Sequence, residues 1–199
     1  VTLNPAIQIS ELNDFAKYRV GTFQEFTTTH SIAKYFLPKE TSIQPYDYND
    51  LVKNLVARTI DVAIVIPEQA IDLVTVGGRI VFDFSPLGKK FLFSGFTIAN
   101  TLEPKYRQAL KSFLVAVREA TRYMVKNKAE AYKKFVKFFP ELRNPRMVFD
   151  YYLKIWSTTT KVDQEDYTAV HKMWKQNYPD LLTQYLPYFR TRSQADRVL

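Results

Sequence analysis

The pattern of apolar residues changes near residue 101, and this change limits the folds open to the chain. Before it, short β-branched runs such as Ile60–Pro67 alternate with amphipathic stretches, whereas after it the apolar residues recur at helical spacing. Strands that alternate with helices are typical of a mainly parallel sheet with helices on both faces. We therefore expect an α/β lobe over residues 1–101 and a helical segment over residues 102–199.

Individual elements follow from local patterns. The expected strands are Tyr18–Phe23, Ser42–Tyr46, Ile60–Pro67, Arg79–Phe84 and Lys90–Asn100. Pro45 places the second of them at a sheet edge or keeps it short, because proline cannot donate to a ladder. Helices are expected after Thr27–Thr29, within residues 46–59, and at 103–127, 129–139, 145–156 and 162–178. The spacing of Phe113, Phe149, Trp156 and Trp174 on these helices predicts core positions.

Composition excludes several classes of protein. The 199 residues are 46% hydrophobic and contain no cysteine, which rules out disulfides and thiolate ligands. No window approaches the roughly 18 consecutive apolar residues of a membrane span, so we expect a soluble chain. His30 and His171 are isolated from each other, and we interpret His171 as a surface residue. No nucleophile, phosphate-binding or dinucleotide-binding motif occurs, so we expect no catalytic residue, metal or cofactor.

The formal charge of +8 favours an anionic partner. The basic residues are nevertheless spread along the second half of the chain, with no block of five or more, and no zinc-finger or RNA-binding signature accompanies them. We expect a solvated basic surface and no nucleic-acid binding.

Four stretches, taken together and in order, resemble solute-binding proteins of the nitrate/sulfonate/taurine type, which serve ABC importers. They are AIQISELNDFAKYRVGTF, LVKNLVARTIDVAIVIPEQA, TLEPKYRQALKSFLVAVREATRYMVKNKAEA and DQEDYTAVHKMWKQNY. The third is similar to the helix that the family writes P-E-x-x-x-A-F-L-x-A. The resemblance implies a periplasmic-binding-protein-like lobe, the second of two, followed by the C-terminal helices.

The resemblance also implies what surrounds this lobe. A first lobe of about ninety residues, by ordinary domain size, would precede it. We expect the opposite wall of the cleft, and the cover for the apolar faces of the C-terminal helices, to come from another chain, a symmetry mate or an altered fold.

Candidate ligand-binding residues precede the first expected helix. The free N–H groups and dipole of a helix N-terminus favour an anion. The family's turn G-x-x-x-S-x-x-H/Y, matched to TFQEFTTTHS, implies that Gly21, Thr28 and Thr29 face the ligand, with Thr27 and His30 beside them. The alternative is a plain N-cap, because one threonine must cap the helix in any case.

Glu68 completes the predicted site. It follows Pro67, where the family writes E-P, and a carboxylate after a parallel strand faces the crevice. The alternative is a glutamate placed at a helix start by the dipole. Asp61 we interpret as a structural turn residue rather than a ligand group.

The function that the resemblance implies is binding of a small ligand between two lobes and its delivery to an ABC permease. An anion such as a sulfonate, nitrate or bicarbonate is favoured. The protein would be extracytoplasmic and would meet the membrane only through that permease. One alternative is a biosynthetic enzyme on the same fold, of the thiamine-pyrimidine or menaquinone-precursor type; the absence of cysteine argues against the first of these. Another is a basic nucleic-acid or protein-interaction module, which only the charge favours.

Overall fold

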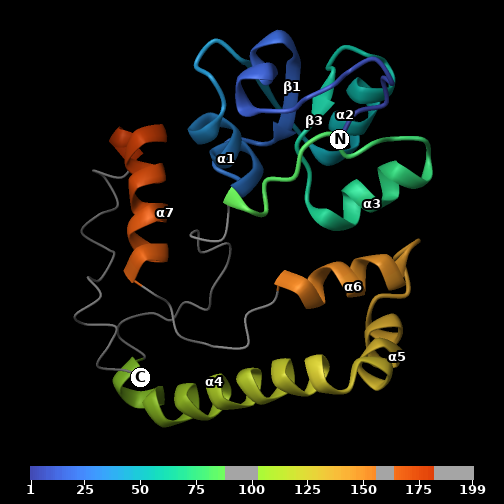
Figure 1. Cartoon of the computed structure of the whole chain (residues 1–199). Helices are drawn as coiled ribbons and strands as arrows, with labels where there is room; N and C mark the ends of the chain where they lie inside the picture. The colour runs from blue at the N-terminus through green and yellow to red at the C-terminus, as the bar shows by residue number, and fades with distance from the viewer. Residues whose placement is uncertain (88–102, 156–163, 182–199) are drawn as a thin grey trace. The chain divides into compact units, whose positions relative to one another are not determined.

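A computed structural model describes residues 1–87, 103–155 and 164–181. The chain divides into two compact units (Figure 1). The first unit is Val1–Lys89 together with His171–Pro179, and the second is Lys90–Val170 together with Asp180–Leu199. The division passes through helix α7 (Gln164–Asn177), so the last residues of this helix belong to the first unit.

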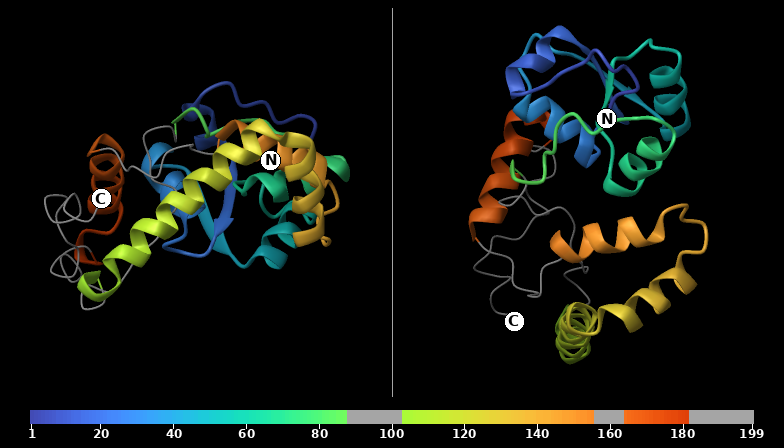
Figure 2. Two further views of the ribbon diagram at one scale, coloured as in Figure 1. Left: turned by 90° about the horizontal axis from the view of Figure 1, so that it is seen from below. Right: turned by 45° about the vertical axis from the view of Figure 1, so that its right-hand side comes forward.

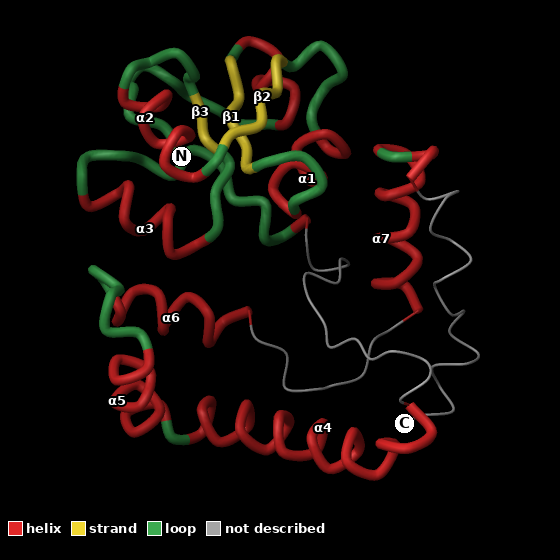
Figure 3. Tube along the Cα trace, turned by 180° about the vertical axis from the view of Figure 1, so that it is seen from behind, coloured by secondary structure: helices red, strands yellow, loops and turns green. Residues whose placement is uncertain are grey.

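The first unit contains a parallel sheet of three strands in the order β2-β1-β3. These strands, drawn in yellow in Figure 3, are β1 (Arg19–Phe23), β2 (Ser42–Tyr46) and β3 (Val62–Ala63). The parallel sheet and the edge position of Ser42–Tyr46 confirm the sequence predictions. Pro45 lies in that edge strand opposite Thr22. Proline has no backbone N–H to donate to a ladder, and an edge strand tolerates this because it has a neighbour on one side only.

Two apolar clusters cover the two faces of the sheet, because successive residues of a strand point to opposite sides. Val20 of β1 faces a cluster with the 3-10 helix η1 (Leu12–Lys17) and helix α1 (Thr28–Phe36). Ala63 of β3 faces a second cluster with helices α2 (Tyr48–Val56) and α3 (Pro67–Thr75). The unit is thus a sheet between two helical layers, as the alternation of strands and helices predicted.

Two expected strands differ from the structure. Of Ile60–Pro67 only Val62–Ala63 forms ladder pairs, and Pro67 is the first residue of α3 instead of the end of a strand. Among the residues that the structure describes, Arg79–Phe84 forms a single antiparallel bridge, between Arg79 and Thr2, and is otherwise irregular. Both runs have β-branched composition, but a strand also needs a neighbouring backbone to pair with. The expected strand Lys90–Asn100 lies outside the described residues.

The second unit contains three helices close to their expected bounds: α4 (Glu103–Lys126), α5 (Lys128–Phe138) and α6 (Pro145–Ile155). Figure 2 shows α4 as one unbroken helix. Phe149 of α6 is fully buried and its ring packs on Tyr132 and Phe135 of α5, as its spacing predicted. Phe113 of α4 is 43% exposed, so its predicted core position is wrong for the described structure. Trp156 lies outside the described residues.

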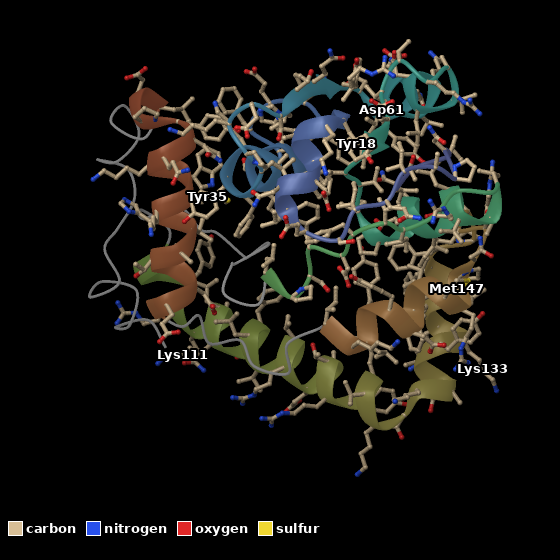
Figure 4. The ribbon with its side chains drawn as sticks, turned by 45° about the horizontal axis from the view of Figure 1, so that its top comes forward. Tyr18, Tyr35, Asp61, Lys111, Lys133 and Met147 are labelled. Atoms are coloured by element: carbon tan, nitrogen blue, oxygen red, sulfur yellow. The ribbon has the colours of Figure 1, made fainter. Side chains whose placement is uncertain are left out.

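The surface of the second unit is basic. Lys111 on α4 and Lys133 on α5 both carry exposed side chains (Figure 4). None of the described helices combines the length and apolarity needed to cross a bilayer.

Candidate ligand-binding site

The carboxyl ends of the three parallel strands share one edge of the sheet, and the predicted site residues follow these ends. Strand β1 leads through residues 24–26 (the β1–α1 loop) to α1, β2 leads to α2, and β3 leads to α3. In open α/β sheets, ligands bind outside this edge. Thr27–His30 and Glu68 therefore come to the same edge from the adjacent strands β1 and β3.

The β1–α1 loop is joined to the start of α2 along this edge. The side-chain amide of Gln24 donates a hydrogen bond to the carboxylate of Asp47, the N-cap residue of α2. The ring of Phe23 lies 6.0 Å from that of Tyr48, between ring centres. These contacts fix the loop between two helix N-termini.

Thr27 is the N-cap of α1. Its Oγ1 accepts a hydrogen bond from the backbone N–H of His30 at 3.4 Å and donates one to the carbonyl of Gln24 at 2.8 Å. Its own carbonyl accepts the first helical bond, from Ser31 at 2.9 Å. The threonine cluster thus caps the helix as the sequence predicted, and Thr27 is the member that does so.

Thr29 and His30 point into the unit. Both are 6% exposed. Thr29 Oγ1 accepts a hydrogen bond from the backbone N–H of Phe23 at 3.2 Å. His30 Nδ1 lies 3.0 Å from Oγ1 of Thr22, a fully buried residue of β1 that also donates to the carbonyl of Phe23 at 2.9 Å. These bonds fasten the first turn of α1 to the end of β1.

The Thr22 hydroxyl lies within hydrogen-bond distance of both the carbonyl of Phe23 and Nδ1 of His30. Whether Nδ1 donates to this hydroxyl or accepts from it depends on the tautomer of the imidazole. Burial lowers the pKa of His30 below its ordinary value; Glu25 acts in the opposite direction and Lys34 in the same one. The imidazole is therefore neutral at neutral pH.

Thr28 is the predicted residue whose polar groups remain open. It is the first residue of α1 and is half-buried. Within the part of the chain that the structure describes, its hydroxyl and the backbone N–H groups of Thr28 and Thr29 have no hydrogen-bond partner. The first N–H groups of any helix lack an intrahelical acceptor. Three donors at the positive end of α1 thus remain for an external oxygen.

Gly21 lies in the middle of β1 and is buried. A Cβ atom on it would lie 2.4 Å from Cδ1 of Ile60 and 2.5 Å from Cδ1 of Leu51. The absence of a side chain therefore allows α2 and the chain before β3 to pack closely on the sheet. This packing accounts for the glycine, and its predicted contact with a ligand stays a prediction.

Glu68 lies in the first turn of α3 and is half-buried. The preceding residue, Pro67, starts the helix, where its missing N–H costs nothing. Gln69 caps the helix, because its side-chain oxygen accepts a hydrogen bond from the backbone N–H of Ile66 at 3.3 Å. Glu68 thus lies both at a helix start and at the carboxyl edge of the sheet. Its position agrees with a residue that lines the ligand cleft and equally with a glutamate that is favoured there by the helix dipole.

Asp61 has the structural role expected from the sequence (Figure 4). Its carboxylate accepts hydrogen bonds from the backbone N–H of Arg19 at 2.9 Å and from the guanidinium at 2.8 and 3.0 Å. These hydrogen bonds from Arg19 hold the pKa of Asp61 below its usual value, against an opposing effect of burial. The pair lies at the amino edge of the sheet, opposite the predicted site, and it lines a hollow together with Thr2 and Arg58.

Sequence reasoning missed two groups of residues around α1. Thr22 carried one signal, a polar residue inside an otherwise apolar strand. Asn177 and Tyr178, at the end of α7, carried none. Asn177 donates to the carbonyl of Ser31 at 2.8 Å, across 146 residues of chain. Among the described residues, no group of three or more histidine, aspartate or glutamate side chains is placed to hold a metal ion.

No protein-family profile matches the chain, and no curated protein matches it in sequence. Among solved structures, it is similar to the periplasmic aliphatic sulphonate binding protein SsuA from Escherichia coli, with a TM-score of 0.68 and 20% sequence identity. The fold is periplasmic-binding-protein-like. The match covers 90% of this chain but only 58% of the sulphonate-binding protein. The expected fold class is confirmed, and the similar structure is that of a binding protein rather than an enzyme.

Proposed function

We propose that this chain is a ligand-binding part of the solute-binding component of an ABC import system. The observation that carries the proposal is the set of open donors at the start of α1, placed at the carboxyl edge of a periplasmic-binding-protein-like sheet. The similar structure is named for binding an aliphatic sulphonate in the periplasm. The protein would bind its solute between two lobes outside the cytoplasm and deliver it to a permease, without catalysis.

The ligand that fits these donors is a small anion. The N–H groups of Thr28 and Thr29 and the Thr28 hydroxyl belong to the first turn of α1, at the positive end of the helix dipole, which favours a sulfonate, nitrate or bicarbonate oxygen. Burial lowers the pKa of His30, so its neutral imidazole adds no charge of its own. The net charge of +8 assists the approach of an anion.

The test is a thermal-shift titration of the full chain with ethanesulfonate, taurine, nitrate and bicarbonate. A bound ligand stabilises the folded state by mass action, by about 1.4 kcal/mol at ten times its Kd. For a chain of this size that corresponds to a rise of about 3–5 °C in the melting temperature. Sodium chloride is the control for a general effect of salt on stability. If the melting temperature does not rise with any of these anions below the concentration at which sodium chloride changes it, the proposal is refuted.

Two substitutions at Thr28 separate its donors. Thr28→Val removes the hydroxyl, whereas Thr28→Pro removes the hydroxyl and the backbone N–H. The proline is compatible with the fold, because Thr28 is the first helical residue and Thr27 before it is extended, with φ −76° and ψ 162°. We expect affinity to fall in the order wild type, Thr28→Val, Thr28→Pro, with at least a tenfold loss in the last.

Thr59→Val is the matched control. Thr59 is an exposed threonine before β3, at the opposite edge of the sheet, and its hydroxyl donates to the carbonyl of Asn54 at 3.1 Å. Its replacement should leave anion affinity unchanged. If Thr28→Pro folds and binds the anion as tightly as wild type does, the ligand does not sit on α1.

A further inference from the structure

The end of α7 packs against α1 and the β1–α1 loop within the first unit (Figure 3). Asn177 donates its 2.8 Å hydrogen bond to the carbonyl of Ser31, and the hydroxyls of Ser31 and Tyr178 lie 3.3 Å apart. All three residues are buried, with exposed fractions of 1% for Ser31, 6% for Asn177 and 8% for Tyr178. A buried side-chain amide that donates to one backbone carbonyl restricts the position of the helix that carries it.

The ring of Tyr178 forms the centre of this contact. Its centre lies 4.9 Å from that of Phe26 and 5.1 Å from that of Trp174. On α1, Nζ of Lys34 lies 4.8 Å from the centre of the same ring, within the range of a cation–π interaction. We refer to Trp174, Asn177 and Tyr178 as the α7 clamp.

Phe26 connects the clamp to the candidate site. It is the last residue of the β1–α1 loop, directly before the N-cap Thr27, and its φ of +67° is in the left-handed region. That conformation costs a side-chain-bearing residue roughly 1–2 kcal/mol, and it persists only where surrounding contacts hold it. The tilted ring contact with Tyr178 is such a contact.

The opposite side of α1 is fixed independently of the clamp. Thr22 and His30 join its first turn to β1, as described above. Those bonds hold the helix but do not reach Phe26. Gln24 and Phe23 hold the start of the β1–α1 loop at α2, so it is the conformation of Phe26, directly before the N-cap, that depends on α7.

We propose that Tyr178 and Asn177 are positioning residues for the ligand site: the α7 clamp holds the β1–α1 loop in the conformation that exposes the first N–H groups of α1. The ligand part of this inference rests on the proposed function, whereas the mechanical part does not. Removal of the clamp lets Phe26 leave its left-handed conformation, and the bonds that the adjacent N-cap Thr27 accepts from His30 and Ser31 then open more often.

Hydrogen exchange at the start of α1 tests the clamp without any ligand. The amides of His30 and Ser31 are suitable reporters, because both donate to Thr27. We expect Tyr178→Leu to accelerate their exchange under native conditions by at least tenfold, through local opening. Tyr178→Phe keeps the ring and should change it by less than threefold.

Tyr18→Leu is the matched control. Tyr18 is a half-buried tyrosine of the same unit whose hydroxyl also makes one bond, to the carbonyl of Gln8 at 3.4 Å, but it lies before β1 and away from the β1–α1 loop (Figure 4). It should lower global stability without accelerating these two amides under native conditions. If Tyr178→Leu does not fold, Asn177→Ala, which removes only the bond to Ser31, replaces it, with an expected acceleration of at least threefold.

The ligand measurement forms a separate arm. Ethanesulfonate should bind at least fivefold more weakly to Tyr178→Leu than to wild type, and equally well to Tyr18→Leu and wild type. Unchanged exchange of the His30 and Ser31 amides in Tyr178→Leu, or in Asn177→Ala where that variant replaces it, overturns the clamp. Faster exchange with unchanged ethanesulfonate affinity overturns the positioning role. Faster exchange in a protein that binds none of the anions leaves the clamp standing and refutes the proposed function instead.

Discussion

Substitution of Gly21 by alanine should destabilise the first unit through one identifiable clash. The new Cβ would lie 2.4 Å from Cδ1 of Ile60 and 2.5 Å from Cδ1 of Leu51, whereas carbon atoms in contact are about 3.5–4.0 Å apart. Each methyl group would have to retreat by about 1 Å, and neither has room, because both residues are at most 1% exposed. Overpacking of this kind costs about 1–3 kcal/mol.

Part of this cost is offset in the unfolded chain. Replacing glycine by alanine there favours folding by about 0.4–1 kcal/mol. We therefore expect a net loss of about 1–2 kcal/mol in the free energy of unfolding, measured from the midpoint of a urea transition at constant slope.

A double-mutant cycle identifies the atom responsible. Ile60→Val deletes Cδ1, the nearest obstacle, and alone should cost about 0.5–1.5 kcal/mol. Gly21→Ala combined with Ile60→Val should be more stable than the sum of the single effects by about 1 kcal/mol, because the alanine methyl occupies the vacated space. Additive effects would refute the packing of Ile60 against Gly21, and with it the role of this glycine.

Two further predictions concern charge. The lowered pKa of His30 means that the unfolded chain binds a proton more readily, so stability should fall as the pH drops from above 6.5 through the folded pKa; His30→Gln should flatten this part of a plot of urea midpoint against pH. An unchanged plot would show that His30 is not buried as described. Asp61 is stabilising in its charged form, whereas His30 is stabilising in its neutral form. Because the pKa of Asp61 is lowered in the folded state, its contribution to stability is complete at pH values well above about 3.8 and is lost as the pH falls below that value. Asp61→Asn should cost about 1 kcal/mol at pH 7, since solvent screens the part-exposed pair with Arg19, and the deficit should shrink in acid; a constant deficit would argue against the ion pair.

The elements whose signals are local were predictable from the sequence. The start of α1 is an example, because capping needs only a threonine followed by a helical apolar pattern, and Thr27 is within three residues of the N–H groups that it serves. The edge position of Ser42–Tyr46 followed from Pro45 alone. The helix α4 agreed with its apolar spacing, although its described side chains are not buried.

The missed features depend on partners that a sequence does not display. Ile60–Pro67 has the composition of a long strand, but β1 offers pairs only at Val20 and Gly21. Within the described part of the chain, Arg79–Phe84 is paired only at its first residue, with Thr2. Strand propensity describes how well side chains fit a pleated surface, and the length of a strand is decided by the backbone beside it.

The sequence by itself therefore determined the order of elements, the caps and the candidate residues at the start of α1. It did so because hydrophobic period and capping act over a few neighbouring residues. Only the tertiary structure decided which of those candidates turn inward, as Thr29 and His30 do, and which stays open, as Thr28 does. It also brought Tyr178 to Ser31 across 147 residues, since such a contact follows from the path of the whole chain and leaves no periodic trace along it.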